Sequence, residues 1–415
     1  MAEKIVVIGQ GHVGLPLAMR AVEAGYEVVG VDADEQHVKR LLDGGSFVEG
    51  VPDARLAAAL EGDRYRATTD VAVADGFDVC VIAVPTPLRS GARDLSGVSE
   101  AARAIAPLLG QGATVILEST VHPGTTDDVL RGLLEEPGLR AGEDFHLGYS
   151  PERSGWGDGR WPQDATPRIV AGLDEASLDR IGRFYVSLTE RVVPVSGIRV
   201  AELAGLLEDT FRHVNMALVN ELAVLAAEQG VDVWEAIEAA CAGPFGRIGF
   251  RPGPGTGGHP GGAEITWPVK NTVGRGSRLI ELADAINTYM PEHVVGRITR
   301  GLNHRRLPLR GSRVLLLGLS RAANSGDLRD SGALAVADSL HGLGAHVRAA
   351  DPYADPDRVP GHIELVRLTP EELAEADAVA VLTDHDCFDY EMAGQAGRYV
   401  FDARDRCSGP NVERL

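Results

Sequence analysis

The chain has 415 residues, and its 60 Asp and Glu against 40 Lys and Arg give a formal net charge of −20 at pH 7. This charge disfavours nucleic acid and anionic membrane surfaces as partners, and the length predicts two or three domains. No apolar run reaches the roughly 18 residues that a membrane-spanning helix requires, so we expect neither a membrane anchor nor a signal peptide. Four scattered cysteines without metal-ligand spacing predict a cytoplasmic protein that holds no metal.

A dinucleotide-binding pattern opens the chain. Ile5–Gly9 is a short apolar run that predicts a strand, and GQGHVG and the helical LPLAMRAVEAG follow it. Gly9, Gly11 and Gly14 permit a tight turn, a bare backbone against a pyrophosphate and a helix N-terminus aimed at it. A second predicted strand, Glu27–Val31, completes the strand–helix–strand unit that makes this glycine pattern specific.

Asp32 follows that second strand, eighteen residues after Gly14. A carboxylate there can accept hydrogen bonds from both hydroxyls of a ribose and would repel a 2′-phosphate, so we predict NAD rather than NADP as the cofactor. His12 and Val13 lie inside the glycine turn, and we expect His12 to pack over the pyrophosphate. The alternative, a purely structural turn, is disfavoured by the combination of strand, glycines, helix and acidic residue.

Strand and helix signals alternate as far as residue 197, which predicts a parallel doubly wound α/β sheet for residues 1–197. The predicted strands and helices are Val79–Val84, Ser96–Leu109, Thr114–Glu118, a helix from Thr126, Phe145–Leu147 and Val192–Val195. Such sheets bind ligands at the carboxyl ends of their strands, and YSPER (149–153) stands at that edge.

Val200–Gly230 predicts a helix of roughly 45 Å, because apolar residues recur at three- and four-residue steps. Gly205 is its only interior helix breaker, and from Met216 onward it is apolar on nearly every side. Such a helix must be covered by another layer or another subunit. Gly205 and Asp209 lie one turn apart and therefore share one face.

A glycine-rich segment, residues 244–270, follows the long helix, and its irregularity predicts a functional loop. Helical periodicity resumes at Ser277–Ile298, so residues 198–300 form a predicted central domain, and Pro308 and Gly311 mark a linker. A second, smaller α/β sheet is predicted for residues 311–415. Its predicted elements are Arg313–Leu317, Gly332–Leu343, Val347–Ala350, Ala378–Leu382 and Tyr399–Asp402.

Motifs along almost the whole chain resemble those of the nucleotide-sugar 6-dehydrogenases, closest to the branch that acts on UDP-glucose and UDP-N-acetylhexosamines. That resemblance implies two Rossmann-like domains joined by a long central helix that also forms a homodimer. It implies NAD on the first domain and a UDP-sugar substrate on the last. The motifs that carry it are GQGHVGLPLA, VPTPL, ESTVHPGTT, YSPER, LLEDTFRHVNMALVNELA, PFGRIGFRPGPGTGGH, RLIELADAINTYMPEHVV and GLSRAANSGDLRDS.

The chain departs from the family pattern where the family's chemistry lies. Pro260 replaces the family's catalytic cysteine, and Glu264 replaces an aspartate four residues later. On the long helix, Gly205 and Asp209 replace a lysine and an asparagine that stabilise an oxyanion. Proline has no nucleophile, so the covalent cysteine step of the family is unavailable. An oxyanion donor contributes on the order of 3–4 kcal/mol, so reversing its charge changes the mechanism.

The resemblance also assigns binding residues. For the cofactor they are Gly9, Gly11, His12, Val13, Gly14, Asp32, Pro85, Thr86, Ser119, Thr120 and Glu152. For the substrate they are Glu152, Arg153, Phe250, Arg251, Gly255, Gly257, Gly258, Arg321, Arg329 and Arg404. Arg321 and Ala322 stand where the family has a Phe-Lys pair, whose lysine reaches the nucleotide sugar.

Three functions fit an intact cofactor turn beside an altered reaction centre. The first is a single reversible hydride transfer on a UDP-hexose or UDP-N-acetylhexosamine, either alcohol-to-ketone oxidation or redox-neutral epimerisation with C4 favoured. The second is a four-electron oxidation to a uronic acid through another nucleophile. The third is a catalytically silent protein that binds a nucleotide sugar.

For the first function, Asp209 or Glu264 is the candidate base, and burial together with the charge of Glu152 would raise its pKa. The loss of a lysine at Gly205 would open space on the helix face, so that a ring hydroxyl can turn toward the nicotinamide. The remaining catalytic candidates are Thr120, Glu152 and His259. In its glycine-rich loop, His259 is either a base or a histidine that satisfies backbone groups.

Overall fold

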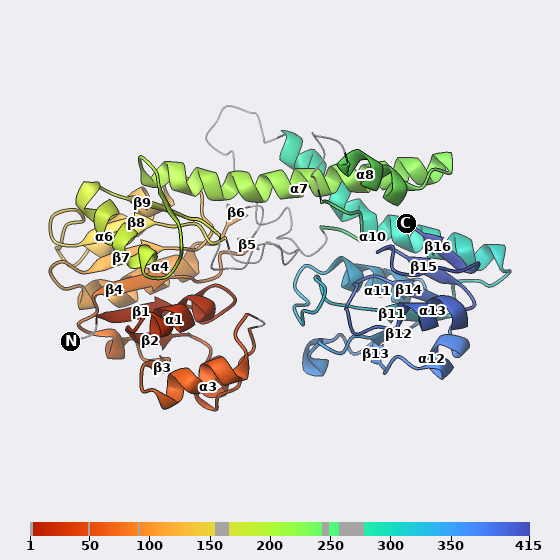
Figure 1. Ribbon diagram of the computed structural model, residues 1–415, viewed down its shortest axis with the longest axis horizontal. Coiled ribbons are helices and arrows are strands. Elements are labelled where there is room, and N and C mark those ends of the chain that lie inside the picture. The colour runs from red at the N-terminus through yellow and green to blue at the C-terminus, as the bar shows by residue number, and fades with distance from the viewer. Residues whose placement is uncertain (1–2, 49, 90–91, 154–165, 243–248, 257–277) are drawn as a thin grey trace. The chain divides into compact units, whose positions relative to one another are not determined.

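The computed structural model describes residues 3–48, 50–89, 92–153, 166–242, 249–256 and 278–415. The chain forms two compact units, Met1–Glu208 and Asp209–Leu415. Each unit is built around one β-sheet with helices on its faces (Figure 1), which confirms the predicted pair of α/β domains. The predicted limits at residues 197, 300 and 311 stay predictions, because the border between the compact units falls inside the long helix.

The first unit contains an eight-stranded sheet in the order β10-β9-β8-β7-β4-β1-β2-β3. Its strands are β1 (Lys4–Ile8), β2 (Glu27–Val31), β3 (Tyr65–Thr68), β4 (Val79–Ile82), β7 (Thr114–Leu117), β8 (His146–Tyr149), β9 (Arg168–Gly172) and β10 (Val192–Pro194). The strands pair in parallel except β8 and β9, which are antiparallel. β9 and β10 form a parallel pair that attaches to β8 in the reverse direction, and strand direction is not encoded in the alternation of strand and helix signals.

Helices in this unit start where a side chain or a turn satisfies their first N–H groups. Asp34 accepts hydrogen bonds from the N–H groups of Gln36 and His37, and Asp174 accepts one from Ser177. The helices and minor elements are α1 (Gly14–Glu23), α2 (Glu35–Leu42), α3 (Asp53–Glu61), η1 (Val71–Ala74), the hairpin β5 (Leu88–Arg89) and β6 (Ala92–Arg93), α4 (Ser96–Ile105), η2 (Ala106–Leu108), η3 (Thr125–Leu130), α5 (Arg131–Glu135) and α6 (Glu175–Val186). The helix predicted from Thr126 begins as a π-helical turn, η3, and continues as α5.

Both faces of the first sheet are buried. Val6 and Ile8 of β1 belong to one apolar core, which also contains Val98 of α4. Ile5 and Val7 belong to the opposite core, with Leu15 of α1. Two-sided burial explains why the central strands read as unbroken apolar runs rather than as alternating patterns.

Helix α7 (Ile198–Gln229) is 32 residues long, close to the predicted Val200–Gly230, and it crosses the border between the units. One side of it is buried, including Ala201, Leu206 and Met216. The other side carries a row of large apolar side chains that are 43% to 65% exposed, namely Leu203, Leu207, Phe211, Leu218, Leu222 and Leu225. The cover expected for this helix therefore does not come from the described part of the chain on that side.

The second unit contains a six-stranded parallel sheet in the order β13-β12-β11-β14-β15-β16. Its strands are β11 (Arg313–Leu317), β12 (His346–Ala350), β13 (Glu364–Leu365), β14 (Ala378–Val381), β15 (Val400–Asp402) and β16 (Val412–Arg414). Its helices are α8 (Val233–Cys241), α10 (Arg278–His304), α11 (Gly332–Gly342), η5 (Pro356–Arg358), α12 (Pro370–Glu375) and α13 (Tyr390–Ala396). Helical periodicity was predicted for Ser277–Ile298, but α10 continues to His304 because Leu302 is fully buried in the core of this unit.

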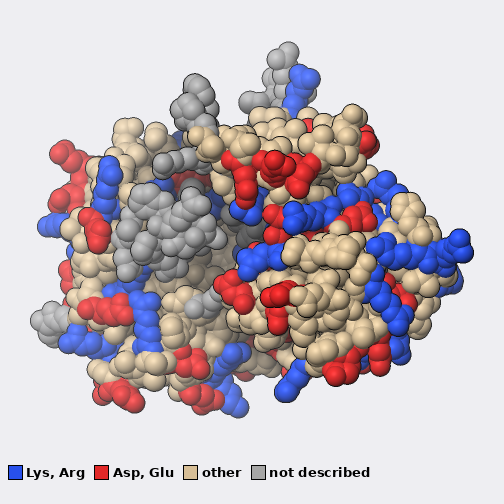
Figure 2. Space-filling view, turned by 45° about the vertical axis from the view of Figure 1, so that its right-hand side comes forward, with Lys and Arg blue, Asp and Glu red and all other residues tan. Residues whose placement is uncertain are grey.

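The surface mixes charges of both signs. Acidic and basic side chains are interleaved over the face shown in Figure 2, so the net negative charge does not gather into one patch there. Among the described residues, no helix combines the length and apolar character needed to cross a lipid bilayer.

Candidate functional site

The glycine turn after β1 has the geometry that a dinucleotide needs. β1 lies between β2 and β4, so the turn stands where the strand order reverses. Gly9 has a φ of +92°, and a Cβ there would lie 2.4 Å from the carbonyl oxygen of Ala83. A Cβ at Gly14 would lie 1.8 Å from the carbonyl oxygen of Gly9, whereas one at Gly11 would meet no atom within 4 Å. The open backbone at Gly11 between two tight positions fits the pyrophosphate of NAD.

Asp32 follows β2 and is fixed by the backbone around it. Its Oδ2 accepts a hydrogen bond from the N–H of Gln10 at 2.7 Å, and its Oδ1 accepts one from the N–H of Asp34 at 2.9 Å. The Asp32 side chain remains 14% exposed, so part of the carboxylate can still meet a ribose. His12 is exposed in the same turn, and Val13 directly precedes the first residue of α1.

The predicted cofactor residues after β4 and β7 are joined by hydrogen bonds. The Thr86 hydroxyl donates to the carbonyl oxygen of Thr120 at 2.7 Å, and the Ser119 hydroxyl donates to that of Val84 at 2.7 Å. Pro85 lies exposed between these contacts. Because β4 and β7 are neighbours in the sheet, the two loops form one continuous edge beside the glycine turn.

A buried polar cluster around Glu152 was not predicted from the sequence. Arg168, the first residue of β9, lies 3.2 Å from a carboxylate oxygen of Glu118 and 3.2 Å from one of Glu152. Tyr185 of α6 donates its hydroxyl to Glu118. Burial raises the pKa of Glu118 to about 7, against the charge of Arg168 and with the support of Glu152. The sequence signal that could have indicated this cluster is Glu118 itself, because an acidic residue directly after a buried strand needs a positively charged partner.

The YSPER segment contacts the long helix within the first unit. Arg153, predicted to bind substrate, donates from Nε and Nη2 to the carboxylate of Glu208 at 3.0 and 2.6 Å. At Gly205 the expectation of open space is wrong. A Cβ at Gly205 would lie 2.8 Å from the Cβ of Pro151, so the proline already fills that part of the helix face.

Asp209, the first residue of the second unit, is paired on its own helix. Its Oδ1 lies 3.3 Å from Nη2 of Arg212, and the two side chains are only 18% and 12% exposed. The guanidinium therefore balances the negative charge that the sequence places at this position.

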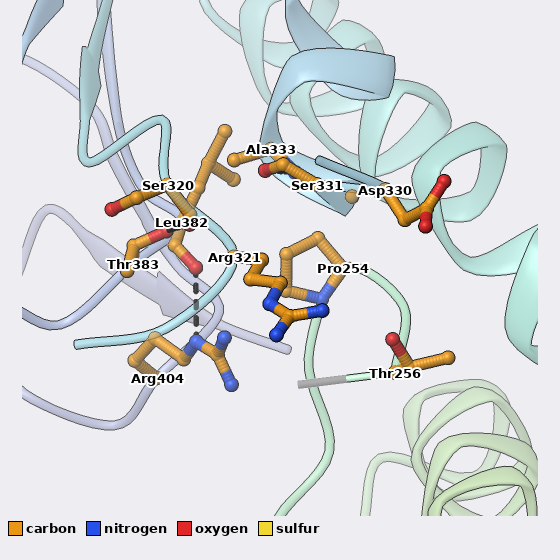
Figure 3. A pocket seen from close by; sticks show the side chains of 11 residues that line it. Pro254, Thr256, Ser320, Arg321, Asp330, Ser331, Ala333, Leu382, Thr383 and Arg404 are labelled. Atoms are coloured by element: carbon orange, nitrogen blue, oxygen red, sulfur yellow. Dashed lines mark hydrogen bonds between the residues drawn. The ribbon is translucent and has the colours of Figure 1, made fainter. Parts of the chain in front are cut away.

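A pocket lies in the second unit at the carboxyl ends of β11, β14 and β15 and at the first turn of α11 (Figure 3). β11 lies between β12 and β14, so the strand order reverses here as it does at the glycine turn. The pocket is a shallow, open depression, and its lining is Pro254, Thr256, Ser320, Arg321, Asp330, Ser331, Gly332, Ala333, Leu382, Thr383 and Arg404. A helix start together with two guanidinium groups favours a phosphate-bearing ligand.

Three of the four predicted arginines of this unit follow the strands of its sheet, and they differ in their placement. Arg404 reaches into the pocket with its Nε donating to the carbonyl oxygen of Leu382 at 2.9 Å (Figure 3). Arg321 also lines the pocket, and its Nε lies 3.3 Å from Asp327. Arg329 is 60% exposed, binds Asp327 through Nε and Nη2 at 2.8 and 2.7 Å, and is not part of the lining. Burial opposes ionisation of Asp327, but the two arginines hold its pKa at about 2.

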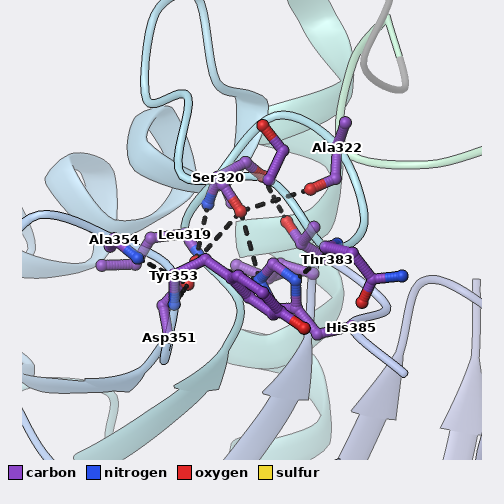
Figure 4. A network of polar contacts seen from close by, with 12 residues as sticks. Leu319, Ser320, Ala322, Asp351, Tyr353, Ala354, Thr383 and His385 are labelled. Atoms are coloured by element: carbon purple, nitrogen blue, oxygen red, sulfur yellow. Dashed lines mark hydrogen bonds and ion pairs between the residues drawn. The ribbon is translucent and has the colours of Figure 1, made fainter. Parts of the chain in front are cut away.

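A buried network fixes the loop that lines this pocket (Figure 4). Asp351 accepts hydrogen bonds from the N–H groups of Leu319 and Ser320 at 2.8 and 3.0 Å. His385 Nε2 lies 3.1 Å from the same carboxylate oxygen. Its Nδ1 accepts the N–H of Asn324 at 2.8 Å, so the proton of the neutral ring is on Nε2.

The segment before the glycine-rich loop is attached to two helices by side-chain amides. Asn220 of α7 accepts the N–H of Gly253 at 3.0 Å and donates to the carbonyl oxygen of Gly255 at 2.9 Å. It also donates to Asn287 of α10 at 2.9 Å, and Asn287 donates to the carbonyl oxygen of His213 at 3.2 Å. Gly255, with a φ of +142°, is thus placed next to the pocket. These two asparagines were not predicted as site residues.

The other residues predicted between positions 250 and 264 are not placed at the pocket by any described contact. Phe250 packs edge-to-face on Phe211 with ring centroids 6.0 Å apart. Arg251 is 57% exposed and lies 3.7 Å from Glu238, and among the described residues it does not line the pocket. The remaining predicted residues, Gly257, Gly258, His259 and Glu264, lie outside the described residues, as does Pro260.

Three domains of one known protein family match most of the chain. Residues 3–189 match the NAD binding domain of the UDP-glucose/GDP-mannose dehydrogenase family, residues 199–289 match its central domain, and residues 315–408 match its UDP binding domain. The glycine turn with Asp32 lies in the first match, and the lining of the pocket after β11 lies mostly in the third.

Individual relatives match over nearly their full length. A UDP-N-acetyl-D-mannosamine dehydrogenase from Pyrococcus horikoshii is 33% identical over 99% of this chain and 97% of the relative. One from Escherichia coli K12 is 33% identical over 96% and 98%. The solved structure of the UDP-D-ManNAc dehydrogenase from Pyrococcus horikoshii aligns with a TM-score of 0.86 at 31% identity, covering 99% of both chains. This chain, with an NAD-binding domain and a UDP-binding domain, is therefore a member of the UDP-glucose/GDP-mannose dehydrogenase family.

Proposed function

We propose that this protein is an NAD-dependent oxidoreductase that transfers a single hydride reversibly at a CH–OH group of a UDP-hexose or UDP-N-acetylhexosamine. The observation that carries the proposal is a complete cofactor turn, from Gly9 to Asp32, in a chain that has Pro260 where the family resemblance implies a cysteine. The first supports redox chemistry with NAD, and the second argues against a covalent adduct with the sugar.

The binding roles follow from the two strand-order reversals. NAD, when bound, supplies the acceptor for the hydride. The Gly9–Gly14 turn would hold its pyrophosphate and Asp32 its ribose. In the second unit, Arg321 and Arg404 would hold the diphosphate of the nucleotide sugar, together with the N–H groups at the start of α11.

Loss of a hydride from CH–OH also requires a base for the hydroxyl proton. Glu152 is our first candidate, because it lies at the ligand edge of the sheet and shares the guanidinium of Arg168 with a second carboxylate, Glu118. Asp209 and Glu264 are the alternatives, and the family resemblance adds Thr120 and His259 as further candidate polar groups. Without a thiol the carbonyl product forms no covalent adduct. It therefore leaves, or takes the hydride back on its other face to give an epimer, at C4 in our proposal.

The relatives favour one competing function. Several are named UDP-N-acetyl-D-mannosamine dehydrogenases, which supports oxidation of that type of sugar. In this chain, which has Pro260 in place of the cysteine, oxidation to the acid would have to use another nucleophile. The two functions differ in stoichiometry, since oxidation to the acid reduces two NAD per sugar and a single transfer reduces one or none.

The test follows the cofactor and the sugar together. Purified protein is incubated with NAD and UDP-N-acetylmannosamine, UDP-N-acetylglucosamine or UDP-glucose, each deuterated at the candidate carbon. We expect at most one NADH per sugar, with either a ketone or an epimer that retains deuterium by NMR. Two NADH per sugar and a uronic acid would overturn the proposal, and binding of both ligands without any product would show a silent binding protein.

Substitutions separate the candidate bases. Asp209→Asn and Glu264→Gln are assayed beside the parent under the same conditions. Full turnover in both variants would exclude these two residues and leave Glu152, whereas a loss of at least about 100-fold in one of them would make it the base.

We also propose that two copies of the chain associate along α7 and that the protein works in the cytoplasm. The exposed row that includes Leu207 and Phe211 supports association, and the free cysteines support a reducing compartment. In sedimentation equilibrium at micromolar concentration we expect a dimer for the parent and a monomer for Leu207→Glu. Leu42→Glu, which changes an equally apolar side chain that is 52% exposed on α2, is the control and should stay dimeric. A monomeric parent would contradict the proposal.

A further inference from the structure

Two carboxylates share one guanidinium in the first unit. Arg168 lies 3.2 Å from Glu118 through Nη2 and 3.2 Å from Glu152 through Nη1. The Glu118 side chain is fully buried, and the side chains of Glu152 and Arg168 are each 12% exposed. Glu118 directly follows β7 and is the first residue of ESTVHPGTT, whereas Glu152 belongs to YSPER at the ligand edge of the sheet.

The groups that face Glu118 come from three elements. Tyr185 of α6 donates its hydroxyl to Oε1 of Glu118, and its ring lies 5.2 Å from the guanidinium carbon of Arg168. Arg168 of β9 also donates to the carbonyl oxygen of Pro151 at 3.3 Å. Glu152, from the loop after β8, supplies the other charge. Oε2 of Glu118 is buried and accepts no hydrogen bond within the described residues, so a negative charge on it is poorly stabilised.

The charge balance of this cluster leaves room for one proton. With both carboxylates ionised, one guanidinium faces two negative charges in a site that excludes most water, and the net charge is −1. With one proton bound, the net charge is zero, which burial favours. Burial raises the pKa of Glu118 to about 7, so the change between these two states falls near neutral pH.

We propose that Glu118 is a positioning residue for Glu152 and, through the shared Arg168, sets whether Glu152 can accept the proton of the substrate hydroxyl. The inference rests on the proposed function with Glu152 as base. In the oxidation direction the O–H bond of the substrate breaks and its proton passes to the Glu152 carboxylate. The cluster then changes from a net charge of −1 to zero, and the same proton returns in the reverse direction or leaves to solvent.

The main test is the pH profile of oxidation in Glu118→Gln. In the parent, kcat/KM rises with pH as the cluster loses its proton. In Glu118→Gln, the guanidinium of Arg168 faces only one carboxylate, Glu152, so we expect Glu152 to bind a proton less strongly and to be a weaker base. We expect the rising limb to move toward acid pH by about one unit or more and kcat to fall about tenfold, with the Kd of NAD unchanged. An unshifted limb in a folded variant would overturn the proposal.

Two further variants keep the test decisive. Tyr185→Phe removes the hydroxyl that donates to Glu118, so its pKa should rise and the limb should move toward alkaline pH, opposite to Glu118→Gln. Glu202→Gln is the matched control. Glu202 is also fully buried, but it accepts hydrogen bonds from Gly124 and Thr126, so its substitution should leave the limb in place. If Glu118→Gln and Tyr185→Phe move the rising limb in the same direction, the proposed coupling between Glu118 and Glu152 is wrong.

A spectroscopic measurement separates this inference from the proposed function. Difference infrared spectra of the NAD-free protein should show a protonated carboxyl band at acidic pH that disappears as the pH rises through neutrality. The band should be lost in Glu118→Gln and kept in Glu202→Gln. If the band titrates but no nucleotide sugar is converted, the proposed function fails while the cluster stands. If a nucleotide sugar is converted but no such band titrates, the cluster fails.

Discussion

Gly9 in the first unit and Gly318 in the second occupy the same place, directly after the strand that comes first in the sequence of each sheet. Their φ values are +92° and +84°, and a Cβ at either would lie 2.4 Å from an atom of the neighbouring loop, Ala83 O or Thr383 Cβ. In both units an aspartate follows the next strand, Asp32 in one and Asp351 in the other. One turn design is therefore present twice.

The two aspartates have different tasks. Asp32 accepts two backbone N–H groups and keeps part of its surface exposed. The side chain of Asp351 is fully buried, and its carboxylate is used by its own loop and by His385. A buried carboxylate that is already paired cannot take ribose hydroxyls. The second unit therefore lacks what the first needs to hold a dinucleotide, although its fold is the same.

The helix that follows each turn differs as well. α1 begins five residues after Gly9, and its first residue, Gly14, packs on the turn itself. α11 begins fourteen residues after Gly318, and its first residue, Gly332, packs on the carbonyl oxygen of Pro254. In the second unit the space beside the helix start is thus shaped by a segment from outside the sheet, which makes a pocket for a different ligand.

The largest effect should come from filling these two helix starts. Cβ atoms at Gly14 and Gly332 would lie 1.8 and 1.7 Å from backbone oxygens, so Gly14→Ala and Gly332→Ala each force the backbone to move. We expect this movement to cost roughly 3 kcal/mol or more in the free energy of unfolding. We expect Gly14→Ala to abolish NAD binding and Gly332→Ala to abolish UDP binding, measured by titration calorimetry. Gly11→Ala, with open space for its Cβ, should keep the parent's thermal stability and weaken NAD alone. Loss of both ligands in both variants would contradict separate sites.

The aspartates provide the next test. Asp351→Asn removes the buried carboxylate that accepts hydrogen bonds from Leu319, Ser320 and His385, so we expect a loss of about 2–3 kcal/mol in the free energy of unfolding. Asp32→Asn should change stability by less than about 1 kcal/mol but weaken NAD at least about tenfold. Urea unfolding and NAD titration measure the two effects. If Asp32→Asn is the more destabilising variant, the contrast between the aspartates is wrong.

Each unit also contains a histidine whose pKa is lowered to about 4, first by burial and then by neighbouring arginines: His122 in the first unit and His293 in the second. The unfolded chain binds these protons near pH 6.5, so between pH 6.5 and 4 it holds more protons than the folded chain. The contribution of these histidines to the free energy of unfolding is therefore fully present above pH 6.5. It is lost as the pH falls toward 4, by up to about 3 kcal/mol per histidine. His122→Gln and His293→Gln should each flatten this decline in urea unfolding at a series of pH values. An unchanged slope in either variant would show that its histidine does not contribute.

The smallest effects should come from surface ion pairs, which do not distinguish the units. Arg55 lies 2.6 Å from Glu23 in the first unit, and Arg313 lies 2.6 Å from Glu375 in the second. Because at least one partner in each pair is more than half exposed, Arg55→Ala and Arg313→Ala should each cost less than about 1 kcal/mol. Urea midpoints in low and high salt measure this, and a larger loss in high salt would be inconsistent with a screened pair.

The parts of the fold that could be predicted from the sequence are those encoded by neighbouring residues. β2 and β11 match their predicted limits because each is an apolar run bounded by charged residues or glycine. The edge strands β3, β13 and β16 were not predicted, because they are two to four residues long and carry charged side chains. Their pairing depends on the neighbouring strand rather than on their own pattern.

The same distinction applies to the candidate site. Gly9 and Asp32 belong to one local turn, and local turn chemistry is readable from sequence. The link between Glu118 and Arg168 joins strands fifty residues apart, and no periodicity indicates such a pair. The expectation of free space at Gly205 was wrong for the same reason, because Pro151 comes from a distant loop.

The contact between Gly205 and Pro151 has a consequence for the engineering of this chain. A side chain cannot be added at Gly205 unless the proline or the helix moves, since the nearest atom would be 2.8 Å from the new Cβ. A lysine introduced at this position by itself should therefore be destabilising. A redesign of this helix face has to change two positions together, Gly205 and Pro151, because neither can be altered in isolation from the other.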